Sequence, residues 1–182
     1  DGFRIDVAHG LVKAAGLPDA DPGLAREHIG PFWDQDGVHE IYRGWRGIAD
    51  EYDDPRVFCG EAWVPSEERL ALYLRSDELH TCFNFEYLDA GWDAARMRQV
   101  IDQTLQTHQR VGAAPTWVLS NHDVVRHRTR LAPGFAQGRP DLDRGLARAR
   151  AATVFLLALP GSAYLYQGEE LGLTEVRDLP DD

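Results

Sequence analysis

The chain has 182 residues, of which 43% are apolar and 27% charged, and this balance excludes a disordered or fibrous protein. It carries 19 Lys and Arg against 30 Asp and Glu, a formal net charge of −11 at pH 7. Because so acidic a chain repels phosphate backbones and anionic lipids, we expect no nucleic acid and no membrane among its partners. Cys59 and Cys82 lie in apolar, strand-like runs and predict reduced thiols, which fit a cytoplasmic protein.

Strand-like runs alternate with helical patterns along the whole chain. Strands are expected at 2–7, 57–64, 81–85, 116–120 and 162–166, and helical apolar stripes at 38–49, from Pro65 onward, and at 97–105 and 146–159. Each stripe is interpreted as core packing. Strand followed by helix predicts an α/β fold with a parallel sheet, either a doubly wound open sheet or a (β/α)8 barrel. No Gly-rich phosphate loop follows a strand, which weakens the dinucleotide-binding version of the open sheet.

Three acidic residues follow these predicted strands. Asp6 closes the first, Glu61 closes the VFCGE run, and Asp123 follows TWVLSNH. Each one alone could be a solvated loop residue or a helix cap. Together they are typical of an active-site mouth at the carboxyl ends of parallel strands, where residues far apart in sequence can meet around one opening. This placement favours the barrel.

Four segments carry a resemblance to a known family. DGFRIDVAHG, VFCGEAWV, WVLSNHD and SAYLYQGEELGL resemble signature regions of the α-amylase superfamily of retaining glycoside hydrolases, most of all its α-glucosidase and oligo-1,6-glucosidase branch. The resemblance implies an α/β fold that is the C-terminal half, about strand 4 to strand 8, of a (β/α)8 TIM barrel. Residues 1–182 are then a partial catalytic domain, without the N-terminal part of the barrel or any C-terminal β domain.

The resemblance also implies catalytic roles. Asp6 matches the nucleophile, Glu61 the general acid/base, and Asp123 the third acid, which stabilises the oxocarbenium-like transition state. Arg4 lies two residues before Asp6, so both side chains point to one face of the strand and the guanidinium can hold Asp6 ionised.

The expected substrate contacts come from several segments. His122 matches the sugar-binding histidine beside the third acid, and His9, Trp63 and Phe85 are further candidates, the two aromatic rings by stacking on a sugar face. The expected substrate is a small oligosaccharide or a disaccharide. No cofactor is implied and no metal site is visible. In related α-glucosidases the residue after the nucleophile is associated with linkage preference, and Val7 resembles the residue of α-1,6-specific enzymes. The residues after Val7 depart from the commonest oligo-1,6-glucosidase pattern, so the linkage stays open.

Three further residues are expected to be structural. Asn121 is predicted to shape the turn before Asp123. Gln167 and Glu169 are predicted to support the rim of the barrel.

The function implied is a retaining α-glucoside hydrolase that releases glucose from short α-glucosides by double displacement. A transglycosylating or isomerising relative, such as a trehalose synthase or sucrose isomerase, and an α-amylase are the alternatives. A non-catalytic, hydrolase-like binding protein is disfavoured because all three acids are present. A metal hydrolase using His122, Asp123 and His127 lacks a ligand signature. The 182-residue chain alone is expected to be poorly stable and inactive, because half a barrel exposes sheet edges.

Overall fold

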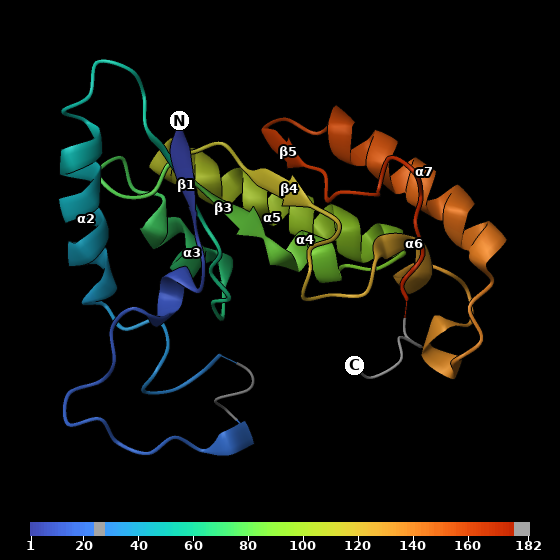
Figure 1. Cartoon of the computed structure of the whole chain (residues 1–182), viewed down its shortest axis with the longest axis horizontal. Helices are drawn as coiled ribbons and strands as arrows, with labels where there is room; N and C mark the ends of the chain where they lie inside the picture. The colour runs from blue at the N-terminus through green and yellow to red at the C-terminus, as the bar shows by residue number, and fades with distance from the viewer. Residues whose placement is uncertain (24–27, 177–182) are drawn as a thin grey trace. The chain divides into compact units, whose positions relative to one another are not determined.

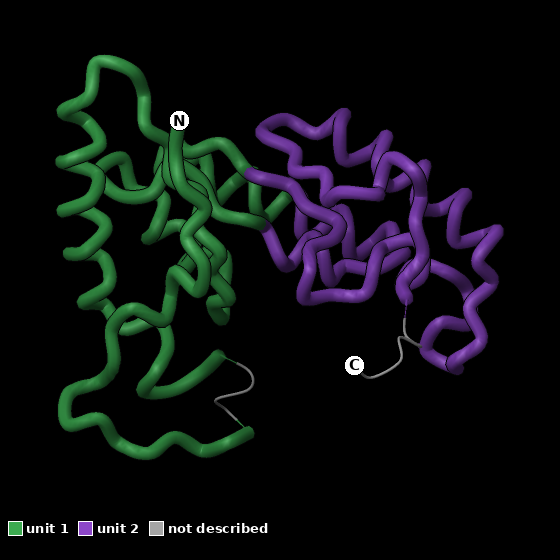
Figure 2. The backbone as a smooth tube through the Cα atoms, in the orientation of Figure 1, with its two compact units in different colours: residues 1–83, 102–115 green, residues 84–101, 116–182 purple. Residues whose placement is uncertain are grey.

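A computed structural model describes residues 1–23 and 28–176 (Figure 1). The chain divides into two compact units, which are described one at a time (Figure 2). Unit 1 comprises Asp1–Phe83 and Asp102–Pro115, and unit 2 comprises Asn84–Ile101 and Thr116–Asp182.

Parallel strands form the centre of unit 1. β1 (Gly2–Ile5) pairs with β2 (Val57–Gly60), and β2 pairs with β3 (Thr81–Asn84), which ends at the boundary of the unit. Ile5 lies opposite Gly60 in the register of the first pair. The residues that follow, Asp6 and Glu61, therefore leave the sheet side by side at its carboxyl edge.

Helices cover these strands. α2 (Val38–Ala49) has the predicted bounds, and α3 (Glu67–Tyr73) follows the predicted start signal, with the Ser66 side chain accepting a hydrogen bond from the Arg69 N–H as the N-cap. A short 3-10 turn, η1 (Ala8–Gly10), follows β1.

The core of unit 1 lies where these elements meet. It contains Ile5, Ala8, Val38, Tyr42, Ala49, Phe58, Ala62, Leu70, Tyr73, Leu74, Leu79 and Cys82. Gly60 is required here, because a Cβ at this position would lie 2.6 Å from Leu79 Cδ1 and 2.9 Å from Cys82 Sγ. β2 therefore packs tightly at the residue before Glu61.

One part of the predicted core is placed differently. Trp45 and Ile48 belong to the apolar stripe of α2, yet they are 39% and 57% exposed. With Phe3 of β1 they line an apolar pocket of about 630 Å³ beside that strand. The interpretation of the whole stripe as core packing was wrong for these two side chains, because only Val38, Tyr42 and Ala49 face the core cluster.

Unit 2 has the same alternation. Its elements are α4 (Phe85–Asp89), β4 (Thr116–Val118), α6 (His127–Arg130), the 3-10 turn η2 (Phe135–Gln137), α7 (Leu142–Ala158) and β5 (Ser162–Tyr164). The helix α5 (Ala94–Val111) belongs to unit 2 up to Ile101 and to unit 1 from Asp102 on. β4 and β5 are parallel, with Thr116 opposite Ser162. The buried Trp117 donates its indole N–H to the Pro160 carbonyl at 2.9 Å.

These elements confirm the predicted α/β class with parallel strands. All five predicted strands form, although β3 ends at Asn84, so that Phe85 begins α4 instead of ending the strand. Asn84 makes this early stop, because its side chain accepts a hydrogen bond from the Tyr87 N–H and caps the helix. Across residues 1–23 and 28–176, no helix combines the length and apolar character needed to cross a membrane.

Candidate active site

One guanidinium joins the two acids at the carboxyl edge of β1 and β2. Arg4 donates from one terminal nitrogen to Asp6 Oδ1 and from the other to Glu61 Oε2, each at 2.5 Å. The contact with Asp6 is the one that the two-residue spacing predicts. The contact with Glu61 follows from the register, in which Arg4 lies opposite Cys59 and Ile5 opposite Gly60.

The two carboxyl groups have different surroundings. The Asp6 side chain is 66% exposed, whereas the Glu61 side chain is 6% exposed. Burial raises the pKa of Glu61, and a hydrogen bond with Asp6 raises it further, while the Arg4 charge acts in the opposite direction. Asp6 is therefore open to a ligand, and Glu61 holds a proton more readily than a free glutamic acid.

The chain turns sharply after Asp6. Val7 has φ 46° and ψ 45°, in the left-handed region that a β-branched side chain rarely adopts. Both backbone polar groups of the next residue are bound, because the Ala8 N–H donates to the Glu61 carbonyl at 2.8 Å and the Tyr42 hydroxyl donates to the Ala8 carbonyl at 2.5 Å. The turn is thus tied to β2 and to α2.

His9 lies inside a cluster of aromatic rings. It is fully buried, its Nε2 lies 2.8 Å from His28 Nδ1, and its ring stacks on Trp33 at a centroid distance of 5.0 Å. Burial lowers the pKa of His9 to about 4, so the imidazole is neutral at neutral pH. The half-buried Trp63 stacks on His28 at 6.1 Å. His28 and Trp33 were not predicted as site residues, because they belong to no motif in the sequence and only the folded structure brings them to His9.

His122 and Asp123 lie together on the surface of unit 2. Their side chains are 57% and 52% exposed, and His122 Nε2 lies 3.4 Å from Asp123 Oδ2. The side-chain oxygen Oδ1 of Asn121 accepts hydrogen bonds from the N–H groups of Asp123 at 2.9 Å and Val124 at 3.0 Å. The predicted turn-forming role of Asn121 is confirmed, and it leaves both neighbouring side chains free of the core.

Most other candidates of unit 2 are buried, although Gln167 is exposed. Phe85 is 6% exposed. Ser120 Oγ lies 3.1 Å from His127 Nδ1, and Glu169 Oε1 lies 3.7 Å from the same nitrogen. Burial raises the pKa of Glu169 to about 7 and lowers that of His127 to about 4. These contacts tie α6 to the end of β4 and to the segment after β5, as a supporting role for Glu169 requires.

The metal-hydrolase alternative gains no support from this placement. His127 is 2% exposed and faces Ser120, whereas His122 and Asp123 are exposed. No group of three or more His, Cys, Asp or Glu side chains suited to a metal ion occurs within the described part of the chain.

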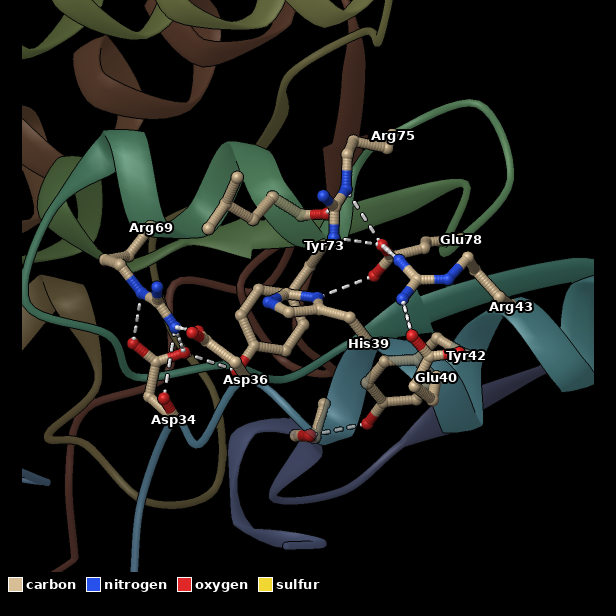
Figure 3. A network of polar contacts seen from close by, with 12 residues as sticks. Asp34, Asp36, His39, Glu40, Tyr42, Arg43, Arg69, Tyr73, Arg75 and Glu78 are labelled. Atoms are coloured by element: carbon tan, nitrogen blue, oxygen red, sulfur yellow. Dashed lines mark hydrogen bonds and ion pairs between the residues drawn. The ribbon is translucent and has the colours of Figure 1, made fainter. Parts of the chain in front are cut away.

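A second charged cluster in unit 1 was not predicted from the sequence (Figure 3). Glu78 is fully buried and accepts hydrogen bonds from Arg43 at 3.0 Å and Arg75 at 2.8 Å, while His39 Nδ1 lies 2.7 Å from its other oxygen. Arg75 and Glu78 are close in sequence, but His39 and Arg43 reach Glu78 only because α2 packs against the segment after α3.

A neighbouring ion pair fixes the loop before α2. Arg69 binds the Asp34 carboxylate at 2.7 and 3.0 Å, and the Tyr73 hydroxyl donates to Asp34 Oδ1 at 2.6 Å (Figure 3). The Asp34 N–H in turn donates to the His9 carbonyl at 2.7 Å. This loop therefore contacts the turn that follows Asp6.

Curated relatives match almost the whole chain. An oligo-1,6-glucosidase of Parageobacillus thermoglucosidasius is 30% identical over 194 residues, which are 97% of this chain and 33% of the relative. Oligo-1,6-glucosidase IMA2 of Saccharomyces cerevisiae is 29% identical over 99% of this chain and 33% of its own length. The chain thus spans about a third of the length of the curated relatives it matches.

Solved structures and a family model agree with these relatives. The alpha-glucosyl transfer enzyme XgtA superimposes with a TM-score of 0.74 at 33% identity, covering 97% of this chain and 34% of that one. A trehalose-6-phosphate hydrolase of Bacillus licheniformis gives a TM-score of 0.71 at 26% identity, covering 96% and 32%. The model of the alpha-amylase catalytic domain matches residues 1–181. The chain therefore belongs to the alpha-amylase catalytic domain family, and its parallel α/β fold is a part of that family's (β/α)8 barrel.

Proposed function

We propose that the complete gene product is a retaining α-glucoside hydrolase that releases glucose from short α-glucosides. The observation that carries the proposal is the shared guanidinium, because Arg4 holds one exposed and one buried carboxyl group next to each other. Relatives named oligo-1,6-glucosidase and maltase support the α-glucoside as the substrate class. The substrate is a small oligosaccharide or a disaccharide, and the reaction as proposed uses no cofactor.

In the first step the exposed Asp6 attacks the anomeric carbon. A bond forms between Asp6 and this carbon, the bond to the glycosidic oxygen breaks, and Glu61 gives its proton to the departing oxygen. The raised pKa of Glu61 suits an acid that must be protonated at working pH. Arg4 supports the role of Asp6 as the nucleophile, because a guanidinium favours the ionised form of the carboxyl group that it binds.

In the second step the roles of Glu61 reverse. Its carboxylate takes a proton from water, the hydroxide attacks the anomeric carbon, and the ester to Asp6 breaks to release glucose in its original configuration. Retaining enzymes hold the two carboxyl groups about 5–5.5 Å apart and inverting enzymes about 6.5–9.5 Å. Two carboxyl groups that share one guanidinium and a hydrogen bond support the shorter separation.

Asp123 and His122 are proposed to bind sugar hydroxyls, with Asp123 also stabilising the positive charge of the transition state. Their exposure supports this role, since a carboxylate and an imidazole on the surface can both reach a ligand. Trp63 is a candidate stacking platform, and Phe85 and His9 stay predictions as substrate contacts, since both are buried in the chain as described. Residues 1–182 are proposed to act as part of one catalytic domain.

The configuration of the first-formed product tests the mechanism. Proton NMR of an aryl α-glucoside hydrolysed by the complete gene product is expected to show α-glucose before mutarotation, and Asp6→Asn is expected to abolish turnover. First-formed β-glucose, or turnover unchanged by Asp6→Asn, would overturn the proposal. Rates on maltose, isomaltose, sucrose and trehalose then decide the linkage.

Glucosyl transfer is a second candidate, favoured by the 33% identity with an alpha-glucosyl transfer enzyme. It uses the same covalent intermediate, with a sugar hydroxyl in place of water as the group deprotonated by Glu61. Product analysis at high maltose concentration separates the two, because trisaccharides accumulate only under transfer.

The two cysteines bear on the proposed location. Cys59 and Cys82 are both buried, and neither belongs to a disulfide. Reduced thiols support the cytoplasm as the compartment in which this enzyme works.

A further inference from the structure

The conformation of Val7 needs support from its surroundings. A β-branched residue in the left-handed region is strained, and such strain persists only where neighbouring groups hold the backbone in place. Asp6 directly precedes Val7, so any relaxation of this turn moves the carboxylate away from Arg4 and Glu61. The groups that hold the turn therefore decide where Asp6 points.

Two hydrogen bonds to the backbone of one residue, Ala8, hold the centre of the turn. The Ala8 N–H donates to the Glu61 carbonyl at 2.8 Å, and the Ala8 carbonyl accepts from the Tyr42 hydroxyl at 2.5 Å. Ala8 is fully buried, so water cannot replace either partner. The first bond comes from the strand end that carries Glu61, and the second comes from α2.

Tyr42 is itself fixed by packing. It is fully buried, and its ring contacts Trp45 at a centroid distance of 5.6 Å and Tyr73 at 6.0 Å. Burial raises the pKa of its phenol, so the hydroxyl keeps its proton across the working pH range. The hydroxyl reaches the turn after Asp6 through its hydrogen bond to the Ala8 carbonyl.

A second anchor acts at the next residue. The Asp34 N–H donates to the His9 carbonyl at 2.7 Å, and Arg69 and the Tyr73 hydroxyl fix the Asp34 side chain (Figure 3). Two successive carbonyls of the turn thus accept hydrogen bonds from α2 and from the loop before it.

We propose that Tyr42 is a positioning residue for Asp6, because its hydroxyl holds, through the Ala8 carbonyl, the strained turn that presents Asp6 to the anomeric carbon. The proposal rests on the proposed function, in which Asp6 is the nucleophile. The sequence marks Tyr42 only as a member of an apolar stripe, a role that the ring alone fills.

Tyr42→Phe in the complete gene product tests the hydroxyl alone, since the ring is kept. On an aryl α-glucoside we expect kcat to fall about tenfold, the effect of one hydrogen bond with an unpaired buried carbonyl. We expect KM to change by less than about twofold, because the lost contact acts on the nucleophile and not on bound sugar. Tyr87→Phe is the matched control: Tyr87 is buried, and its hydroxyl has no hydrogen-bond partner among the described residues.

An exogenous nucleophile separates positioning from general structure. In Asp6→Gly, azide can attack the anomeric carbon as the aryl oxide leaves, which gives the β-glucosyl azide. Tyr42→Phe is expected to change this azide-dependent rate by less than about twofold, because no side chain remains to be positioned. An equal loss with and without Asp6 would show a merely structural role and overturn the proposal, as would unchanged kcat in Tyr42→Phe.

A second background keeps the test decisive if Tyr42→Phe folds poorly. Glycine adopts the left-handed conformation without strain, so in Val7→Gly the turn depends less on the Tyr42 hydroxyl. We expect Tyr42→Phe to lower kcat by less than about threefold in this background, and the full tenfold loss there would contradict the proposal. If instead Asp6→Gly alone retains activity without azide, the proposed function fails, whatever Tyr42 does.

Discussion

Two clusters of arginine and carboxylate groups lie in unit 1, and they balance their charges in opposite ways. Around Glu78, Arg43 and Arg75 donate to one fully buried carboxylate, with His39 on its second oxygen (Figure 3). At the carboxyl edge of β1 and β2, one arginine serves two carboxyl groups.

The difference separates a structural cluster from a reactive one. Glu78 is fully buried and contacts Arg43 and Arg75, so it is a packed partner that no ligand can reach. Glu61 has too little positive charge around it to offset its burial, and its pKa rises. A buried carboxyl group with a raised pKa, such as Glu61 beside the exposed Asp6, is typical of sites that must exchange protons.

Glu61→Gln should separate activity from stability. We expect kcat on an unactivated disaccharide to fall at least about 10³-fold, because amide nitrogen cannot donate and regain a proton as the acid does. The free energy of unfolding should not decrease, because a carboxyl group whose folded-state pKa is raised costs stability once pH rises through that pKa. Steady-state kinetics and urea unfolding at pH 7 measure both. A clear loss of stability would remove the contrast with Glu78.

Glu78→Gln should lower the free energy of unfolding and leave kcat nearly unchanged, the reverse of Glu61→Gln. Removing the shared carboxylate breaks the ion pairs of Glu78 with Arg43 and Arg75, and we expect unfolding to become easier by about 3 kcal/mol. The folded variant should keep kcat within about twofold, since Glu78 is not among the groups that perturb Glu61. Glu40→Gln is the matched control: its side chain is 78% exposed and also pairs with Arg43, so its loss should cost under about 0.5 kcal/mol.

Arg4→Lys tests whether one cation must reach both acids. An ammonium keeps the charge but lacks the planar fork that contacts Asp6 and Glu61 together, so kcat/KM should fall about 30-fold. Arg56→Lys serves as the control, because Arg56 lies over the Tyr52 ring and touches neither acid in any contact described here. Activity of Arg4→Lys above half of the original would show that the fork is unnecessary.

Glu169 provides a third, weaker case in unit 2. The pKa of Glu169 is raised from 4.5 to about 7 in the folded protein, so the folded state binds this proton more tightly than the unfolded state does. The resulting contribution to the free energy of unfolding is complete below pH 4.5 and is lost as pH rises through 7. The pKa of His127, about 4, works oppositely: stability present above pH 6.5 is lost as pH falls toward 4. The two effects oppose each other between pH 4.5 and 6.5.

Glu169→Gln removes one of these opposing effects. On acidification from pH 6.5 to 5, its unfolding free energy should fall more steeply than that of the original protein, by about 1 kcal/mol per pH unit, because Glu169 no longer offsets the loss from His127. At pH 8 the variant should be more stable than the original protein, by about 2 kcal/mol. Urea titrations at several pH values give the slope, and a slope equal to that of the original protein would contradict the raised pKa of Glu169.

Local patterns predicted much of the fold. The stripe from Val38 to Ala49 gave α2 without error, and the start signal at Ser66 gave α3. α7 begins at Leu142, before the apolar stripe starts, because Asp141 caps it by accepting a hydrogen bond from the Arg144 N–H. The early end of β3 likewise depends on a cap, at Asn84, that apolar periodicity does not show.

The candidate site divides in the same way. The contact of Arg4 with Asp6 follows from strand geometry, and so do the neighbouring positions of Asp6 and Glu61. The Glu78 cluster and the hydroxyl of Tyr42 depend on which helix face meets which loop, and this information lies outside any short window of sequence. The meeting of Asp123 with the other two acids around one opening stays a prediction.

At Gly60, a mutational scan would show a loss of function caused by packing that looks the same as the loss of a catalytic group. Any side chain there would run into Leu79 and Cys82, so every library member substituted at this position should be depleted as strongly as those at Glu61. The two losses have different origins, and a stability screen without substrate would eliminate only the Gly60 variants. Gly60 is thus a position at which packing restricts the evolution of β2, and its intolerance of substitution does not make it a catalytic residue.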